Sequence, residues 1–552
     1  MDNTRLFLWL GLVAMLWLNY SAWLADRAPA PVETPAATVE APPSPAVPEE
    51  DDALPDIADD AAPPDAVAVE AEAPAEAPSD PIRVRTDVLD VWIAPEGGDL
   101  VRADLLDYPV EKHRPDEPVR LLDYTAADRW IFQTGLRGAG EGPEPNHLAT
   151  FRADQTTYEL AEGQDELVVR LEWAGGDGLS AYKTYTFRRG DYRIDLDMQL
   201  RNDSGMPWRG ASYAQMLRAH HPPERSYMSV ETYSFAGPVL YDGDQYEKLD
   251  VEDLRDEPVT QTLQGGWLAG IQHHFLAAAV PPPDQQVRYQ ATTRGDEYVL
   301  TAVGPVLTVE PGAGESFPYT LFVGPKLQEE LEATADGLEL TVDYGVLTIL
   351  AQPLFWVLSH VHDLVGNWGW AIVIVTMLIK LAFYKLTQTS GRSMAKMRKL
   401  APRMKALQER YKDDRQALSR AMMEMYRKEK VNPAAGCLPI LVQMPFFFAF
   451  YWVLIESVEM RQAPFILWID DLSSRDPFFV LPLLMGAAMF FQTRLNPAPP
   501  DPMQARIMQI MPIVFTAMFA LFPAGLVLYW LTNTVLSILQ QWRINKVVAR
   551  ES

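Results

Sequence analysis

The sequence has very little cysteine: Cys437 is the single one among 552 residues. One thiol excludes an internal disulfide framework and a paired-cysteine metal or redox site. Adjacent histidines occur at 220–221 and 273–274, but neighbouring side chains on a strand face opposite ways, so neither pair predicts a metal site. The glycines of 311–316 are followed by no lysine, which argues against a phosphate loop. These residues therefore predict no metal site, no cofactor site and no enzyme active site.

Basic residues are almost absent from residues 26–80, which hold 15 Asp and Glu against one Arg and contribute -14 of the formal charge of -27. The same segment contains 12 prolines. Such a tract cannot bury an apolar core, and its like charges repel one another, so we predict an extended linker. Residues 1–25 before it carry the apolar run Leu6–Leu18 behind Arg5. This run predicts a transmembrane signal anchor, with a cleaved secretory signal as the alternative.

Residues 81–335 alternate between apolar and polar side chains, the period of a half-buried strand. The clearest case is Tyr192–Arg201, and 166–173 and 183–188 are similar. Glycine-rich turn signals recur between these runs. The region predicts a large antiparallel β-sandwich, soluble and on the outer side of the membrane.

Long apolar stretches are concentrated in the C-terminal half of the chain, and they predict a polytopic α-helical membrane protein. With the anchor they give six spans and place both termini in the cytoplasm. The predicted segments are an interfacial amphipathic helix at 336–366, transmembrane helices at 367–387, 436–457, 478–494, 507–522 and 526–543, a periplasmic loop at 458–477, a cytoplasmic loop at 495–506 and a short cytoplasmic tail at 544–552.

A lysine, Lys380, lies inside the apolar stretch Gly369–Thr387. A charge near the centre of a membrane helix costs about 2.5–3.5 kcal/mol, so the ammonium must either snorkel to the interface or face a wet cavity. Polar groups that would face such a cavity are Thr376 in the same span and Gln443 and Asn533 in other spans. Since no carboxylate lies deep in another span, the pattern favours a cationic, hydrated recess.

Residues 388–435 predict a basic helical hairpin. Within 385–435 there are 14 Lys and Arg against 5 Asp and Glu, a density that marks the cytoplasmic side. Its basic face would meet anionic headgroups or RNA phosphates. The candidate docking residues are Lys396, Arg398, Lys399, Arg403 and Lys405.

Several motifs in order along this half carry a resemblance to a known family. The chain resembles the YidC membrane protein insertases of Gram-negative inner membranes. The motifs are SMAKMR at 393–398, KVNP at 430–433 followed by Gly436-Cys437, QMP at 443–445, SVE at 457–459, RQAPF at 461–465, Leu467-Trp468, Asp471-Leu472, DPMQ at 501–504, Phe522-Pro523 and GLVLY at 525–529.

The resemblance implies insertion and folding of nascent inner-membrane proteins, alone or beside the Sec translocon, without nucleotide hydrolysis. It implies an uncleaved anchor, a variable linker, a periplasmic β-supersandwich and a five-helix core whose groove opens to cytoplasm and lipid. The hairpin would dock the signal recognition particle receptor and ribosomes, although the tail used for ribosome contact in some relatives is short here.

The resemblance also assigns roles to single residues. The essential positive charge of the family's groove is usually arginine and falls here on Lys380, which keeps the charge and loses the planar guanidinium fork. Met444 and Phe447 match the helix along which substrates slide, and Tyr529 and Trp530 match an aromatic pair on the last core helix.

Two other functions are compatible with the same pattern. One is a polytopic solute or ion transporter with a periplasmic sensor domain, which would need paired ionisable groups or broken-helix repeats. The other is a structural assembly partner of other membrane complexes, for which Lys380 would be dispensable.

Overall fold

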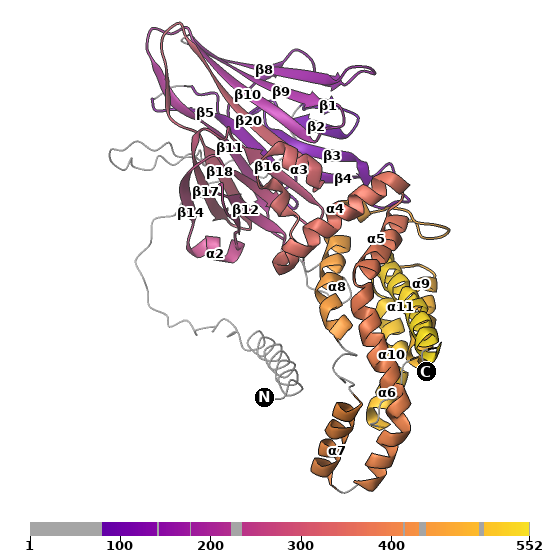
Figure 1. Ribbon diagram of the computed structural model, residues 1–552. Helices are drawn as coiled ribbons and strands as arrows, with labels where there is room; N and C mark the ends of the chain where they lie inside the picture. The colour runs from indigo at the N-terminus through magenta and orange to yellow at the C-terminus, as the bar shows by residue number, and fades with distance from the viewer. Residues whose placement is uncertain are drawn as a thin grey trace, which may run out of the picture.

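The computed structural model describes residues 80–140, 143–176, 178–221, 234–411, 414–429, 438–495 and 502–550. The predicted anchor at 1–25 and nearly all of the predicted linker lie outside these residues, as does Cys437. The described chain forms a β-domain followed by a group of helices, with α4 lying where the two meet (Figure 1).

The β-domain contains two large, mainly antiparallel sheets, which confirms the predicted all-β sandwich. The first is 11-stranded, in the order β14 (Val259–Gln264), β17 (Gln286–Arg294), β18 (Glu297–Val303), β11 (Trp208–Ala219), β5 (Trp130–Gly138), β3 (Leu100–Pro109), β2 (Leu89–Ile93), β1 (Ile82–Arg85) and β7 (Thr157–Glu159), with β19 (Leu307–Val309) beside β11 and β4 (Pro118–Leu122) beside β3. The second is 9-stranded, in the order β13 (Tyr246–Lys248), β12 (Gly237–Tyr241), β15 (Trp267–Ile271), β16 (Phe275–Val280), β20 (Gly314–Pro325), β10 (Arg193–Asn202), β9 (Leu179–Arg188), β8 (Glu166–Gly176) and β6 (Arg152–Ala153).

Strand β10 shows why the sequence forms this sandwich. It lies between β9 and β20, and its apolar side chains at every second position are all buried. The alternation in the sequence therefore becomes one buried face and one partly exposed face. This outcome confirms the strand predicted at Tyr192–Arg201.

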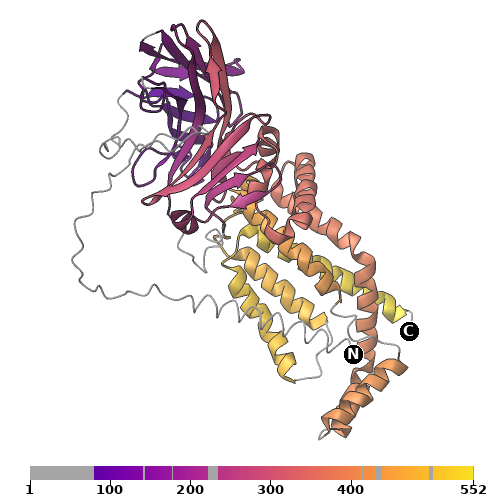
Figure 2. The same ribbon diagram turned by 90° about the vertical axis from the view of Figure 1, so that its left-hand side faces the viewer.

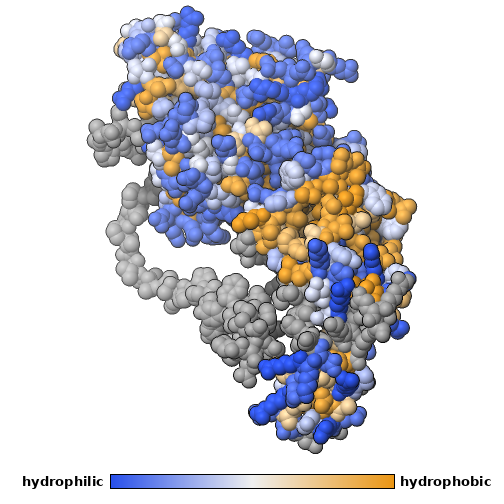
Figure 3. Space-filling view, in the orientation of Figure 1, coloured by the Kyte–Doolittle hydropathy of each residue, from blue (hydrophilic) through white to orange (hydrophobic). Residues whose placement is uncertain are grey.

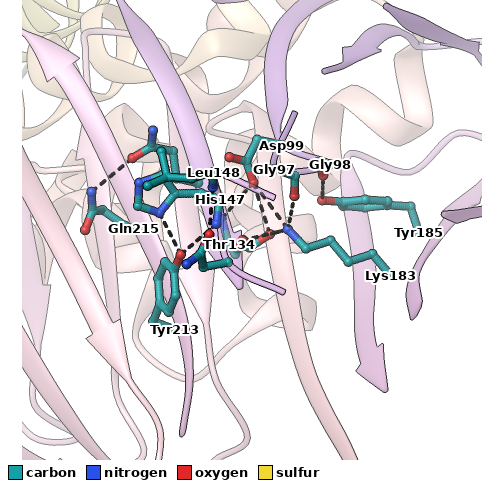
Figure 4. A network of polar contacts seen from close by, with 12 residues as sticks. Gly97, Gly98, Asp99, Thr134, His147, Leu148, Lys183, Tyr185, Tyr213 and Gln215 are labelled. Carbon is teal, nitrogen blue, oxygen red and sulfur yellow. Dashed lines mark hydrogen bonds and ion pairs between the residues drawn. The ribbon is translucent and has the colours of Figure 1, made fainter. Parts of the chain in front are cut away.

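A buried lysine links the two sheets. Lys183 of β9 donates hydrogen bonds to the carbonyl and hydroxyl oxygens of Thr134 on β5, at 2.6 and 2.8 Å, and to the Gly97 carbonyl (Figure 4). Its Nζ also lies 3.3 Å from Oδ1 of Asp99, which accepts the Thr134 N–H at 2.9 Å. Both charged side chains are nearly inaccessible to solvent. The lysine thus has four oxygen neighbours in place of water.

His147 lies beside this network and packs edge-on against Tyr213. The tyrosine hydroxyl accepts the backbone N–H of His147 and lies 2.6 Å from its Nδ1. The other ring nitrogen, Nε2, is buried without a hydrogen-bond partner among the described residues. Burial lowers the pKa of His147 from 6.5 to about 3, so the folded β-domain holds a neutral imidazole.

This depressed pKa predicts loss of stability in weak acid. The unfolded chain takes up a proton at His147 near pH 6.5 and the folded chain does not, so stability is complete above pH 6.5 and falls as the pH decreases towards 3. The expected loss from this group is about 1 kcal/mol at pH 5.5. Denaturant unfolding of the whole chain, followed by tryptophan fluorescence, should show a smaller loss of stability in His147→Gln than in the wild type. The matched control is His113→Gln, at an exposed histidine, which should lose as much stability on acidification as the wild type. If His147→Gln and His113→Gln lose equal stability as the pH falls, the prediction is contradicted.

The helical part begins at the end of the β-domain and extends away from it (Figures 1 and 2). One short helix, α2 (Val251–Asp256), lies within the β-domain. The other helices among the described residues are α3 (Gln328–Thr334), η2 (Leu338–Thr341), η3 (Gly345–Leu347), α4 (Thr348–Val365), α5 (Trp368–Ala382), α6 (Tyr384–Arg410), α7 (Arg415–Lys428), α8 (Leu438–Glu456), η5 (Val458–Met460), α9 (Val480–Leu495), α10 (Pro502–Phe519) and α11 (Ala524–Arg550).

The structure divides the single helix predicted at 367–387. Helix α5 ends at Ala382 and α6 begins at Tyr384, with 62° between them. At the break, the N–H of Phe383 bonds to the carbonyls of Ile379 and Leu381. Among the described residues no single helix is both long and apolar enough to cross a membrane. Taken together, the two helices of this bent pair are long enough and apolar enough to do so.

Apolar side chains form a broad exposed area on the helical part, between the polar β-domain and the polar α6–α7 hairpin (Figure 3). Helices α9 and α10 also expose many apolar side chains: Leu483, Leu484, Phe490, Phe491, Ile507, Ile510, Ile513 and Val514. Soluble monomers rarely expose so large an apolar surface, which indicates a surface covered by lipid or by protein.

Candidate functional site

Lys380 lies near the C-terminal end of α5 and reaches towards α11. Its ammonium donates a hydrogen bond of 2.9 Å to the hydroxyl of Ser537, which itself donates at 2.7 Å to the backbone carbonyl of Asn533. In the described part of the chain, no carboxylate pairs with this ammonium. The half-buried charge is therefore held by a neutral hydroxyl, which leaves it free to attract an anionic group.

The other predicted groove residues are placed differently. Thr376 is buried, and its hydroxyl donates to the Ile372 carbonyl of its own helix at 2.6 Å. Asn533 contributes its backbone carbonyl to the site. Gln443 is half-buried on α8 and has no hydrogen bond with another described residue. The structure thus joins Lys380 to α11 and leaves the Thr376 hydroxyl occupied within α5.

Ser537 is the residue that sequence reasoning missed. It lies one helical turn after Asn533 and therefore on the same face of α11. A search for hydroxyl side chains at that spacing from the predicted groove residue would have found it.

The predicted slide residues fall into two groups. Phe447 of α8 packs against both members of the aromatic pair on α11, with ring centroids 6.0 Å from Tyr529 and 4.7 Å from Trp530. Met444 is 41% exposed one turn earlier on α8. The aromatic contact connects α8 to α11, whereas Met444 is open to a ligand.

At the end of the helices next to the β-domain, the segment between η5 and α9 packs on the start of α5. The Asn367 amide donates to the backbone carbonyls of Pro464 and Phe465 at 3.2 and 3.1 Å. The Phe465 ring packs directly on Gly369, where a Cβ would lie 2.0 Å from the ring. Only glycine permits this contact, so the first turn of α5 is shaped to receive the loop.

Arg403 is the one predicted docking residue of the α6–α7 hairpin whose side chain the structure describes. Arg403 is 70% exposed and pairs with Glu429 at 2.7 Å, which ties α6 to the end of α7. The side chains of the other four predicted docking residues, Lys396, Arg398, Lys399 and Lys405, lie outside the described residues.

One of the two histidine pairs requires a correction. His273 and His274 lie in the turn between β15 and β16, and their rings stack with centroids 3.8 Å apart. The expectation that they face opposite ways is wrong, because it assumed a strand at a turn. Among the described residues, no group of three or more His, Cys, Asp or Glu could hold a metal ion.

Comparison with known proteins covers nearly the whole chain. Residues 81–357 match the family model described as "YidC periplasmic domain", and residues 360–551 match that described as "60Kd inner membrane protein". A protein of Thioalkalivibrio sulfidiphilus is 49% identical over 562 residues, covering 100% of this chain and 99% of its own length. One of Nitrosococcus oceani is 48% identical over 556 residues with full coverage of both chains. A third, from Alkalilimnicola ehrlichii, is 53% identical over 466 residues, or 84% of this chain and 82% of that one. Each of the three carries the name "Membrane protein insertase YidC".

Proposed function

This chain belongs to the YidC family, and from that membership we propose that it inserts and folds nascent membrane proteins in the bacterial inner membrane. The β-domain then lies in the periplasm, and the α6–α7 hairpin and both termini lie in the cytoplasm. The function involves no covalent chemistry and needs no cofactor.

The observation that carries the proposal is the Lys380 ammonium between α5 and α11, held by a hydroxyl and by no described carboxylate. A hydrated recess around it shortens the low-dielectric distance that a polar tail must cross, and the positive charge attracts acidic residues of that tail. The closed outer end beside Gly369 supports a recess that opens to the cytoplasm and to lipid.

The apolar surfaces supply the driving force for release. A substrate helix leaves the recess sideways along α8 and α10, where Met444 and Ile513 are exposed. Transfer of its side chains into lipid contributes about 0.8 kcal/mol per buried CH₂, so no nucleotide is required.

The partners follow from the same proposal. Substrates arrive either directly from ribosomes or through the Sec translocon. The basic hairpin docks the signal recognition particle receptor and the ribosome, with candidate contacts at Lys396, Arg398, Lys399, Arg403 and Lys405.

The proposal is tested by complementation of a Gram-negative strain depleted of its own insertase. We expect the wild-type chain to restore growth and to insert a small client with an acidic periplasmic tail, so that added protease cleaves the translocated tail. A membrane-integrated chain that restores neither growth nor cleavage would reject insertase function and favour the transporter alternative. The matched control is the empty vector under the same depletion.

A further inference from the structure

The β-domain holds the carboxyl-terminal end of α8 through two histidines. The Ile455 carbonyl belongs to the last turn of the helix, where carbonyl groups have no partner within the helix. His273 and His274 both place Nε2 at 3.1 Å from this oxygen. A carbonyl only accepts hydrogen bonds, so each imidazole donates from a protonated Nε2. The two donors use both lone pairs of one helix-terminal oxygen.

The environment favours the neutral form of both rings. Burial lowers the pKa of His273 to about 4 and that of His274 well below its ordinary value. The rings also stack with centroids 3.8 Å apart, a separation at which two positive charges would repel strongly. Both imidazoles are therefore neutral hydrogen-bond donors at physiological pH.

The next residue of α8 extends the contact. Glu456 is 4% exposed and accepts a hydrogen bond of 2.6 Å from the Ser234 hydroxyl. It shares a cavity of about 120 Å³ with the buried Lys326. The ammonium has no hydrogen-bond partner among the described residues, and the backbone N–H of Lys326 donates to the His274 carbonyl at 2.9 Å. A polar cavity of this size has room for a water molecule between the two charges.

A second set of hydrogen bonds lies close by. Arg461 and Gln462, just after α8 and η5, donate to the Pro109 carbonyl at 2.8 and 2.9 Å. Lys112 donates in the other direction, to the Gln462 carbonyl at 3.0 Å. The end of α8 is thus tied to the β-domain at two places.

The two halves of α8 differ in their packing. The side chains of Ala449, Phe450, Val453 and Leu454 in the outer half are buried, whereas Met444 and Phe448 in the inner half are exposed. Helix α8 packs mainly on α4, which lies at the junction with the β-domain (Figure 1). Support is therefore concentrated at one end of the helix.

We propose that the polar joint, formed by His273, His274 and Lys326 with Ile455 and Glu456, is a positioning device that fixes the outer end of α8 to the β-domain. The amino-terminal half of α8 then moves about this fixed end when a substrate passes. This movement of α8 rests on the proposed function, because it assumes that α8 lines the insertion path. The polar joint itself gives the β-domain a mechanical role in the helical part.

The test measures the position of α8 in the whole chain by spin-label distances, in a Cys437→Ser background. One label pair joins Val168 of β8 to Met444 of α8, both exposed; the control pair joins Val168 to Val110 within the β-domain. We expect His273→Ala/His274→Ala to widen the Val168–Met444 distance distribution at least about twofold, as for a released hinge, and to leave the control pair unchanged. The conservative variant His273→Gln/His274→Gln restores amide donors and should return the narrow distribution.

Two results would overturn the proposal. An unchanged Val168–Met444 distribution in the alanine variant, with the control pair intact, would show that the polar joint does not hold α8. A wide distribution in the glutamine variant would show that hydrogen-bond donation is not the cause. Lys326→Met, which keeps both histidines, should widen the distribution less than the alanine variant. Failure of the proposed function would appear separately, as a wild-type chain with a narrow distribution that inserts no client.

Discussion

Lys380→Ala should reduce insertion of a client with an acidic tail by about tenfold or more, which corresponds to about 1.4 kcal/mol. The expected size follows from electrostatics: two charges 4 Å apart interact by about 4 kcal/mol at an effective dielectric constant near 20. Since the described ammonium contacts a hydroxyl and no carboxylate, little of this attraction is consumed inside the protein. The measurement is protease accessibility of the translocated tail after a pulse of client synthesis.

Two variants separate charge from packing. Lys380→Arg keeps the charge and should retain most of the insertion. Ser537→Ala removes the hydroxyl partner of the ammonium, leaves the charge in place and should cost much less than Lys380→Ala. A client whose acidic tail residues are changed to asparagine should respond weakly to every one of these variants. Equal insertion by wild type and Lys380→Ala would reject the cationic recess, although the fold would stand.

Asp99→Ala should destabilise the β-domain by about 3–5 kcal/mol, the usual cost of leaving one member of a buried ion pair alone. Lys183 would keep its three neutral oxygen partners at Gly97 and Thr134 but lose its counter-charge. The ammonium is too deeply buried to regain water without opening the sandwich. Denaturant unfolding of the whole chain at pH 7.5, followed by tryptophan fluorescence, would measure the change.

The controls for this prediction come from the same domain. The double variant Asp99→Leu/Lys183→Met removes both charges and should be more stable than Asp99→Ala, because no charge remains buried. Arg201→Ala breaks an exposed pair with Asp203 and should cost less than about 1 kcal/mol. Similar losses of unfolding free energy in Asp99→Ala and Arg201→Ala would show that the buried charge of Lys183 does not need the Asp99 carboxylate.

The β-domain was predictable from sequence because its signal repeats. In β10, the apolar side chains at 194, 196, 198 and 200 agree with one another, so no single residue decides the prediction. In β9 the same register places Lys183 on the buried face with Tyr185 and Phe187. The alternation thus extends to Lys183, but its partners Asp99 and Thr134 come from distant strands that no local pattern identifies.

The candidate site was predictable only in part. The cost of a charge in an apolar segment singles out Lys380, whatever surrounds it. Ser537 and the break at Phe383 depend on how α5, α6 and α11 pack, and no proline or glycine marks the break in the sequence. The stacking of His273 and His274 was misjudged for a similar reason, since a two-residue turn can resemble the end of either adjoining strand.

The contact between Gly369 and Phe465 has a consequence for energy conservation. If the recess lies in the inner membrane as proposed, its closed end is what separates it from the periplasm. That membrane stores a proton gradient, which even a narrow aqueous leak would dissipate. An aromatic ring seated directly on a helix backbone leaves no room for a file of water molecules. If the proposed function holds, the glycine allows a recess open to the cytoplasm to coexist with an electrically tight membrane.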